Sequence, residues 1–204
     1  MRISSVWDAI PSQLAKPNSR FFLSRVSPNA RAREYAPALQ WLCDAGLVFK
    51  TTRVSTPKVP LRSYLEPEIV KLYAQDIGLL RVKANLSVES ILDPGAMSEF
   101  KGALAENLVA ASLKRTYGIE PCYWASGAQA EVDFLIESQG RVFPAEVCAG
   151  TGRAGRSLSV FAAKFDPTLS IRLSGRNLKK DDKLLNVPLC LIDWLPHWIR
   201  LAGL

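Results

Sequence analysis

The chain has a single histidine, His197, and its four cysteines form no C-x-x-C pair. A zinc site needs several clustered nitrogen and sulfur ligands, so this composition argues against one. We interpret the widely spaced cysteines as reduced and mostly buried thiols. The sequence also has no G-x-x-x-x-G-K-[S/T] phosphate loop, and the glycine-rich segment 150–155 lacks the lysine and the serine. We therefore predict no ATP site in this chain.

Long apolar runs are also missing. No run approaches the roughly 20 residues that a membrane-spanning helix requires, and the N-terminal segment 1–5 does not resemble a secretory signal. We therefore expect a soluble, cytoplasmic protein without a membrane partner. With 204 residues, of which 48% are hydrophobic, the chain can form one large domain or two small ones.

Positive charge is concentrated near the N-terminus. The net charge is +7, and before residue 61 nine Lys and Arg residues face three acidic ones. From residue 97 onward the balance is thirteen to eleven. A basic N-terminal third is typical of a protein that binds a polyanion such as DNA. An ordinary solvated basic face, or a site for an acidic protein partner, would have the same charge.

The first part of the chain has the pattern of a winged helix. Apolar spacing and turn residues predict helices and short strands in the order helix, strand, helix, strand and loop, over residues 5–16, 21–26, 31–45, 47–54 and 57–60. A helical adaptor could share this order. In a winged helix, five basic residues are placed to contact phosphates: Arg31, Arg33, Lys50, Arg53 and Lys58.

A domain boundary is predicted near residue 95, at Pro94-Gly95, after a further strand candidate at 69–73. We therefore expect one domain over 1–95 and a second over 96–204. The second domain begins with a strong helical pattern, and a tight turn at 138–140 joins two of its strands. Its predicted helices are 98–117, 157–165 and 193–204, and its predicted strands are 122–124, 131–137, 141–148, 169–173 and 187–192.

Three carboxylates of the second domain follow the order of a metal-dependent phosphodiesterase core. Glu106 lies in the first helix, and Asp133 and Glu146 lie in paired strands. Because side chains alternate along a strand, the hairpin can bring Asp133, Glu146 and Cys148 to one face. Clustered carboxylates favour a hard cation such as Mg²⁺. The alternative is that Asp133 and Glu146 pair with basic residues and that Glu106 lies on a solvated helix face.

A family resemblance covers essentially the whole chain. The chain resembles the C-terminal half of a large family of bacterial and archaeal AAA-type ATPases, a domain of unknown function with a PD-(D/E)xK nuclease-like fold. The segments that carry the resemblance are 30–35, 41–47, 71–80, 99–107, 123–124, 130–136 and 146–150. The resemblance implies an α/β (α+β) architecture: a winged-helix-like domain and then a restriction-endonuclease-like mixed sheet flanked by helices.

The resemblance also implies catalytic and metal-binding roles for Glu106, Asp133 and Glu146. Cys148 stands where the family usually has its catalytic lysine, and Lys164 or Lys101 is a candidate substitute. Cysteine is a poor Mg²⁺ ligand and lacks the positive charge. We therefore expect a DNA-associated nuclease-like module with impaired catalysis. One alternative is an active Mg²⁺-dependent endonuclease with a migrated lysine. The other is an interaction module that docks on an ATPase partner, since family members usually carry an ATPase domain upstream and this chain has no phosphate loop; the chain is then either a fragment of a longer protein or the separately encoded C-terminal half.

Overall fold

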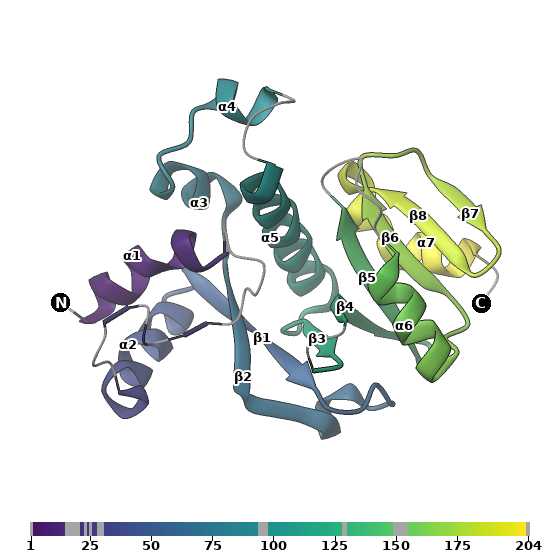
Figure 1. The fold of residues 1–204 in the computed structure, drawn as a ribbon, viewed down its shortest axis with the longest axis horizontal. Coiled ribbons are helices and arrows are strands. Elements are labelled where there is room, and N and C mark those ends of the chain that lie inside the picture. Colours follow the sequence, from purple (N-terminus) through teal and green to yellow (C-terminus); the bar gives the residue numbers. More distant parts are fainter. Residues whose placement is uncertain are drawn as a thin grey trace. The chain divides into compact units, whose positions relative to one another are not determined.

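A computed structural model describes residues 2–14, 21–22, 24, 26–27, 31–93, 98–127, 130–148 and 155–202. Within these residues the fold is a mixed α/β structure whose eight strands form one sheet in the order β2-β1-β3-β4-β5-β6-β8-β7 (Figure 1). The strands are β1 Val48–Val54, β2 Leu65–Ala74, β3 Cys122–Ala125, β4 Glu131–Ser138, β5 Arg141–Cys148, β6 Ser170–Ser174, β7 Lys179–Asp181 and β8 Leu184–Pro188.

Seven α-helices and two short 3-10 helices lie within the described residues. They are α1 Arg2–Leu14, α2 Ala32–Asp44, η2 Leu61–Tyr64, α3 Ile77–Lys83, α4 Val88–Leu92, α5 Ser98–Tyr117, α6 Arg156–Phe165, η3 Leu189–Trp194 and α7 Leu195–Leu201. No helix in the described part of the chain combines the length and the apolar character that a membrane crossing requires. The predicted α/β class with a mixed sheet is confirmed.

The chain forms two compact units, and each unit is discontinuous in sequence. The first comprises 1–51 and 69–111, and the second comprises 52–68 and 112–204. The continuous strands β1 and β2 and the helix α5 each have one part in either unit. The division at residue 95 and the winged-helix assignment stay predictions.

In the first unit α1 packs against α2, and α5 is hydrogen-bonded to the end of β2. Apolar positions at helical spacing along α1, among them Val6 and Ile10, are buried. Phe49 on β1 and Tyr73 on β2 are also buried, with ring centroids 5.8 Å apart. The Asn107 amide of α5 both accepts from the Ala74 N–H (2.8 Å) and donates to the Ala74 carbonyl (2.9 Å). This pair of hydrogen bonds satisfies both backbone groups at the last residue of β2.

The second unit is built on the β4–β5 hairpin. Gln139 and Gly140 form its two-residue loop with φ of 52° and 71°. Two positive φ angles are typical of a type I′ turn, which matches the twist of the flanking strands. Strands β5, β6 and β8 then run parallel. Helices α6 and α7 lie on opposite faces of this part of the sheet (Figure 1).

The remaining predicted elements agree with the structure except near the C-terminus and at residues 21–26. The strand predicted at 187–192 is wrong: β8 ends at Pro188, and η3 follows as a 3-10 helix. Proline has no N–H for a ladder, so it is a natural strand end. The short, fully exposed strand β7 was not predicted, because its residues lack apolar alternation. The strand predicted at 21–26 falls partly outside the described residues, and none of the described residues 21, 22, 24 and 26 belongs to a strand. The Phe21 N–H donates to the Val70 carbonyl at 3.0 Å.

Candidate functional site

The β4–β5 hairpin places Asp133 and Glu146 on one face of the sheet. The ladder pairs Leu135 with Pro144 and Phe134 with Ala145. The paired ladder ends at Phe134 and Ala145, and one further step in the same antiparallel register sets Asp133 opposite Glu146. Directly opposed residues share a face. An Asp133 Oδ2 atom accepts the N–H of Val147 at 2.8 Å. The aspartate carboxylate thus binds the backbone of β5 next to Glu146.

Glu146 lies between a helix start and an arginine. Gly155, the residue before α6, donates its backbone N–H to the Glu146 carboxylate. Gly155 has a φ of 145°, which L side chains rarely adopt, so glycine is needed there. On the other side, Arg172 of β6 is the register partner of Glu146. Burial raises the pKa of Glu146 above its usual range, and the positive charge of Arg172 opposes that shift.

Cys148 occupies the position of the expected lysine on the same face of β5. It is partly buried, and its register partner on β6 is Ser174. Burial, and then the negative charge of Glu146, raises the pKa of the Cys148 thiol to about 12. A thiol with that pKa is neutral at pH 7, so Cys148 supplies neither a positive charge nor a reactive thiolate.

This environment predicts slow alkylation of Cys148. Only about one thiol in ten thousand is ionised at pH 8 when the pKa is about 12. We expect Cys148 to react with iodoacetamide at least ~100-fold more slowly than the exposed Cys190. Peptide mass spectrometry over a time course measures both rates in one sample, and unfolding in denaturant provides the control by bringing the two rates together. Equal rates in the folded protein would contradict a partly buried, neutral Cys148.

Glu106 is bound by two side chains of β2 in the first unit. Its Oε1 atom accepts from the Lys71 ammonium at 3.0 Å and from the Tyr73 hydroxyl at 2.5 Å. The Lys71 side chain is only 1% exposed. Glu106 is therefore a partly buried carboxylate, 20% exposed, that pairs with a buried lysine in its own unit. Pairing with a basic residue is the alternative that the sequence left open for Asp133 and Glu146. Asp133 and Glu146 belong to the second unit.

The predicted substitute lysines both contact other groups. Lys164 lies near the C-terminal end of α6, with its ammonium 5.6 Å from the Trp124 ring and 5.3 Å from the Phe165 ring. Glu146 binds the residue at the opposite end of that helix. Lys101 belongs to the first unit and donates to the Asp93 carbonyl. The cation beside Glu146 is Arg172 instead.

The five basic residues predicted to contact DNA are divided between the units. Arg31 and Arg33 are exposed at the start of α2, and Lys50 reaches the Gln40 side chain of that helix at 3.5 Å. In the second unit, Arg53 forms two hydrogen bonds with Glu66, at 2.5 and 2.9 Å, which neutralise its charge locally. Lys58 is exposed and lines a pocket of about 400 Å³ together with Arg141.

Sequence reasoning missed three polar residues that extend the carboxylate face across β6 and β8. Arg172 and Asn186 are register partners, and Arg176 follows β6. The sequence contains one indication of these residues, because Arg172 interrupts an otherwise apolar strand at one position. Only the parallel order β5-β6-β8 shows that this position faces the same side as Glu146.

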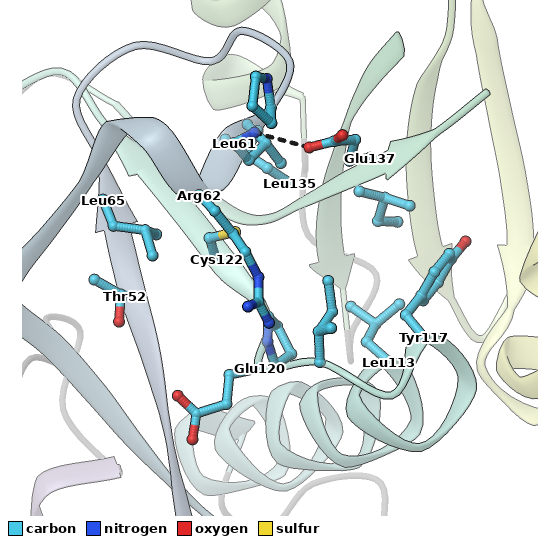
Figure 2. A pocket seen from close by; sticks show the side chains of 14 residues that line it. Thr52, Leu61, Arg62, Leu65, Leu113, Tyr117, Glu120, Cys122, Leu135 and Glu137 are labelled. Atoms are coloured by element: carbon cyan, nitrogen blue, oxygen red, sulfur yellow. Dashed lines mark hydrogen bonds between the residues drawn. The ribbon is translucent and has the colours of Figure 1, made fainter. Parts of the chain in front are cut away.

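A separate and larger pocket, of about 540 Å³, lies in the second unit (Figure 2). Its wall is mainly apolar, with Leu61, Leu113 and Leu135 among its lining residues. The Glu137 carboxylate accepts the Leu61 N–H at 2.8 Å beside it. Burial raises the pKa of its Cys122 thiol to about 11, so this thiol is neutral. None of the residues predicted from the sequence to be catalytic, metal-binding or DNA-binding lines this pocket.

Within the described part of the chain, no group of three or more His, Cys, Asp or Glu side chains is arranged to hold a metal ion. The carboxylate pair nevertheless has one feature of a metal site: one Glu146 oxygen, Oε2, is buried without a hydrogen-bond partner among the described atoms. Magnesium is often held by only one or two carboxylates together with substrate phosphates. Asp133 and Glu146 therefore fit such a sparse site, and the roles predicted for Glu106, Asp133 and Glu146 stay predictions.

Two family models match separate parts of the chain. Residues 101–192 match a domain of unknown function, DUF4143, and residues 1–90 match another, DUF8612. The boundary predicted at residue 95 lies between the two matched segments. No curated protein and no solved structure matches the chain.

Proposed function

We propose that this protein is a DNA-associated, nuclease-like module whose catalysis is impaired. The observation that carries the proposal is the set of side chains on one face of β4, β5 and β6: Asp133 and Glu146, with Arg172 in register with Glu146 and a neutral thiol at Cys148. Paired carboxylates beside a cation suit a phosphodiester and its metal ion. The resemblance to a PD-(D/E)xK fold supports the same conclusion.

In this proposal Asp133 and Glu146 hold Mg²⁺ weakly and need the phosphate of DNA to complete its ligands. When bound, the ion would polarise the phosphodiester and lower the pKa of a bound water. Val147 and Gly155 orient the carboxylates through their N–H groups. The neutral Cys148 cannot stabilise the charge that develops on the phosphate, which is the reason for weak catalysis.

The arrangement also supports a second candidate, an active endonuclease in which Arg172 replaces the lysine. Arginine stays protonated and stabilises negative charge, but it cannot deliver or accept a proton at neutral pH. Lys164 and Lys101 are weaker candidates because their ammonium groups have other partners. The two candidates differ only in how much activity survives, so one assay can separate them.

DNA association is proposed through the basic residues of the winged-helix-like region. Arg31, Arg33, Lys50 and Lys58 are the best candidates for phosphate contacts, whereas Arg53 is already paired with Glu66. An AAA-type ATPase is the proposed protein partner, in line with the family resemblance. A cytoplasmic location is part of the same proposal.

Restoring the lysine tests the catalytic proposal. We expect Cys148→Lys to raise metal-dependent nicking of supercoiled plasmid by about 100-fold, since one well-placed charge in a site of this kind contributes that much. Wild type, Cys148→Ala and Cys148→Lys are compared in Mg²⁺ and in Mn²⁺, with the neutral alanine variant as the matched control. Asp133→Ala in the lysine background should abolish the gain.

Two results would contradict this proposal. Robust wild-type cleavage that is lost in Asp133→Ala would favour the active endonuclease. If cleavage is also lost in Arg172→Ala, Arg172 supplies the positive charge in place of the lysine. No gain from Cys148→Lys with an intact fold would contradict the assignment of weak catalysis to Cys148, because more than the lysine would then be missing. Binding of labelled duplex DNA, measured at two salt concentrations, tests the association separately, because phosphate contacts make the affinity depend on salt.

A further inference from the structure

A small basic pocket in the second unit includes Arg172, the residue that is in register with Glu146. Its volume is about 310 Å³, at the lower end of the roughly 300–1,000 Å³ typical of small-molecule sites. Three cationic side chains line it against one carboxylate: Arg172, Arg176 and Lys179 against Asp181. The lining therefore carries an excess of positive charge, which suits an anion.

Buried hydrogen bonds hold the segment that presents Arg176. The Ser174 hydroxyl donates to Asn186 Oδ1 at 2.8 Å and accepts the Arg176 N–H at 3.1 Å. The Asn186 amide donates to the carbonyls of Arg176 and Asn177, at 3.2 and 2.8 Å. Ser174 and Asn186 are both buried. The pocket wall is thus built on satisfied buried polar groups rather than on a loose surface loop.

Sheet register explains why the cationic groups converge. Arg172 on β6 pairs with Asn186 on β8, and Asn186 pairs with Lys179 on β7. Residues paired in this way share a face, so Lys179 lies on the side of the sheet that carries Glu146. Lys180, the next residue of β7, faces the other way and donates to the Ala202 carbonyl after α7. Arg172 belongs to both the pocket and the surroundings of Glu146.

We propose that this pocket binds a phosphate group, and that this group is a backbone phosphate of DNA held beside Asp133 and Glu146. The assignment to DNA rests on the nuclease-like function proposed above. Guanidinium groups bind phosphate oxygens through paired N–H donors, and the lysine adds a third cation. Lys179 forms an exposed ion pair with Asp181 at 2.8 Å, which a phosphate can replace at little cost. A free phosphorylated molecule has the same chemistry, so the test separates the two sources.

The test compares two double variants of the full chain. Arg176→Ala/Lys179→Ala removes two pocket cations, and Lys183→Ala/Arg200→Ala removes two exposed cations of the same unit that do not line the pocket. The net charge is therefore equal in the two variants. Fluorescence anisotropy with a labelled duplex oligonucleotide gives the affinity across a salt series, and circular dichroism checks the fold. Thermal unfolding in inorganic phosphate against chloride, at equal ionic strength, probes the phosphate group alone.

We expect the pocket variant to bind DNA about tenfold more weakly than the control variant, with a salt slope smaller by about 2. Phosphate should raise the unfolding temperature of wild type and of the control variant, but not that of the pocket variant. Equal DNA affinity and salt slope in the two variants would overturn the pocket assignment while leaving DNA association intact. If wild type binds no DNA but phosphate stabilises it through the pocket, the proposed function fails and the ligand is a free phosphorylated molecule. If wild type neither binds DNA nor is stabilised by phosphate, both the pocket assignment and the proposed function are overturned.

Discussion

Replacing Glu106 by alanine is expected to lower the free energy of unfolding by ~3–5 kcal/mol, the cost typical of removing one partner of a buried ion pair. The Lys71 ammonium is 3.0 Å from Glu106, and its side chain is 1% exposed, so the variant takes away a carboxylate from a charge that water cannot reach. The Tyr73 hydroxyl loses the Glu106 acceptor in the same change. Urea unfolding followed by circular dichroism measures the effect.

A double variant provides the control for Glu106. Replacing both partners, as Glu106→Leu with Lys71→Met, should recover most of the loss, because apolar residues of similar volume often replace a buried ion pair without cost. A change below about 0.5 kcal/mol in Glu106→Ala, as is usual for surface positions, would show that the ion pair contributes little. If Mg²⁺ stabilises wild type but not Glu106→Ala, the metal-binding role predicted from the sequence gains support.

Phe161→Ala is expected to be the most damaging single change in the second unit, with a loss of ~4 kcal/mol. Phe161 is buried, and its ring meets Trp124 edge-on at 5.2 Å and Phe165 at 4.8 Å. These contacts hold α6 against the sheet. Because the residue before α6 donates its N–H to Glu146, a loosened helix should also weaken DNA binding and any metal-dependent cleavage.

Lys164→Ala is the matched control on the same helix. Its ammonium lies over the rings of Trp124 and Phe165 but is exposed, so we expect a loss of only ~0.5–1 kcal/mol. Thermal and urea unfolding distinguish the two variants. If Lys164→Ala abolished a cleavage activity without unfolding the protein, the migrated-lysine hypothesis would be revived. If Phe161→Ala were harmless, α6 would not depend on the aromatic cluster.

The strands and the turn of the β4–β5 hairpin were predictable from the local sequence pattern. Strands at 131–137 and 141–148 with a turn between them were predicted from alternation and a Gly-containing turn, and the structure has strands Glu131–Ser138 and Arg141–Cys148. The prediction that Asp133, Glu146 and Cys148 share a face follows from that same register. Hairpin register is local, because a two-residue loop leaves only one pairing that buries the apolar face.

The hydrogen-bond partners of Glu106 could not be predicted from the local sequence pattern. Its place on a helix was predicted, and α5 begins and ends at the predicted residues. Its binding to Lys71 and Tyr73 requires a contact across more than thirty residues of sequence. No periodicity encodes such a contact, since it depends on how β2 packs against α5. A carboxylate predicted to be catalytic from the order of the elements is therefore, in the structure, the ion-pair partner of the buried Lys71.

The sequence by itself determined the mixed α/β class, most of the strands, the helices other than α3 and α4, and the shared face of Asp133, Glu146 and Cys148, because these depend on hydrophobic periodicity and short turns. Only the tertiary structure decided which cations meet those carboxylates. Strands β5, β6 and β8 are joined by crossovers, so the neighbour of Glu146 is set by the strand order rather than by sequence distance. That order brings in Arg172 and, with it, the pocket that Arg176 and Lys179 line.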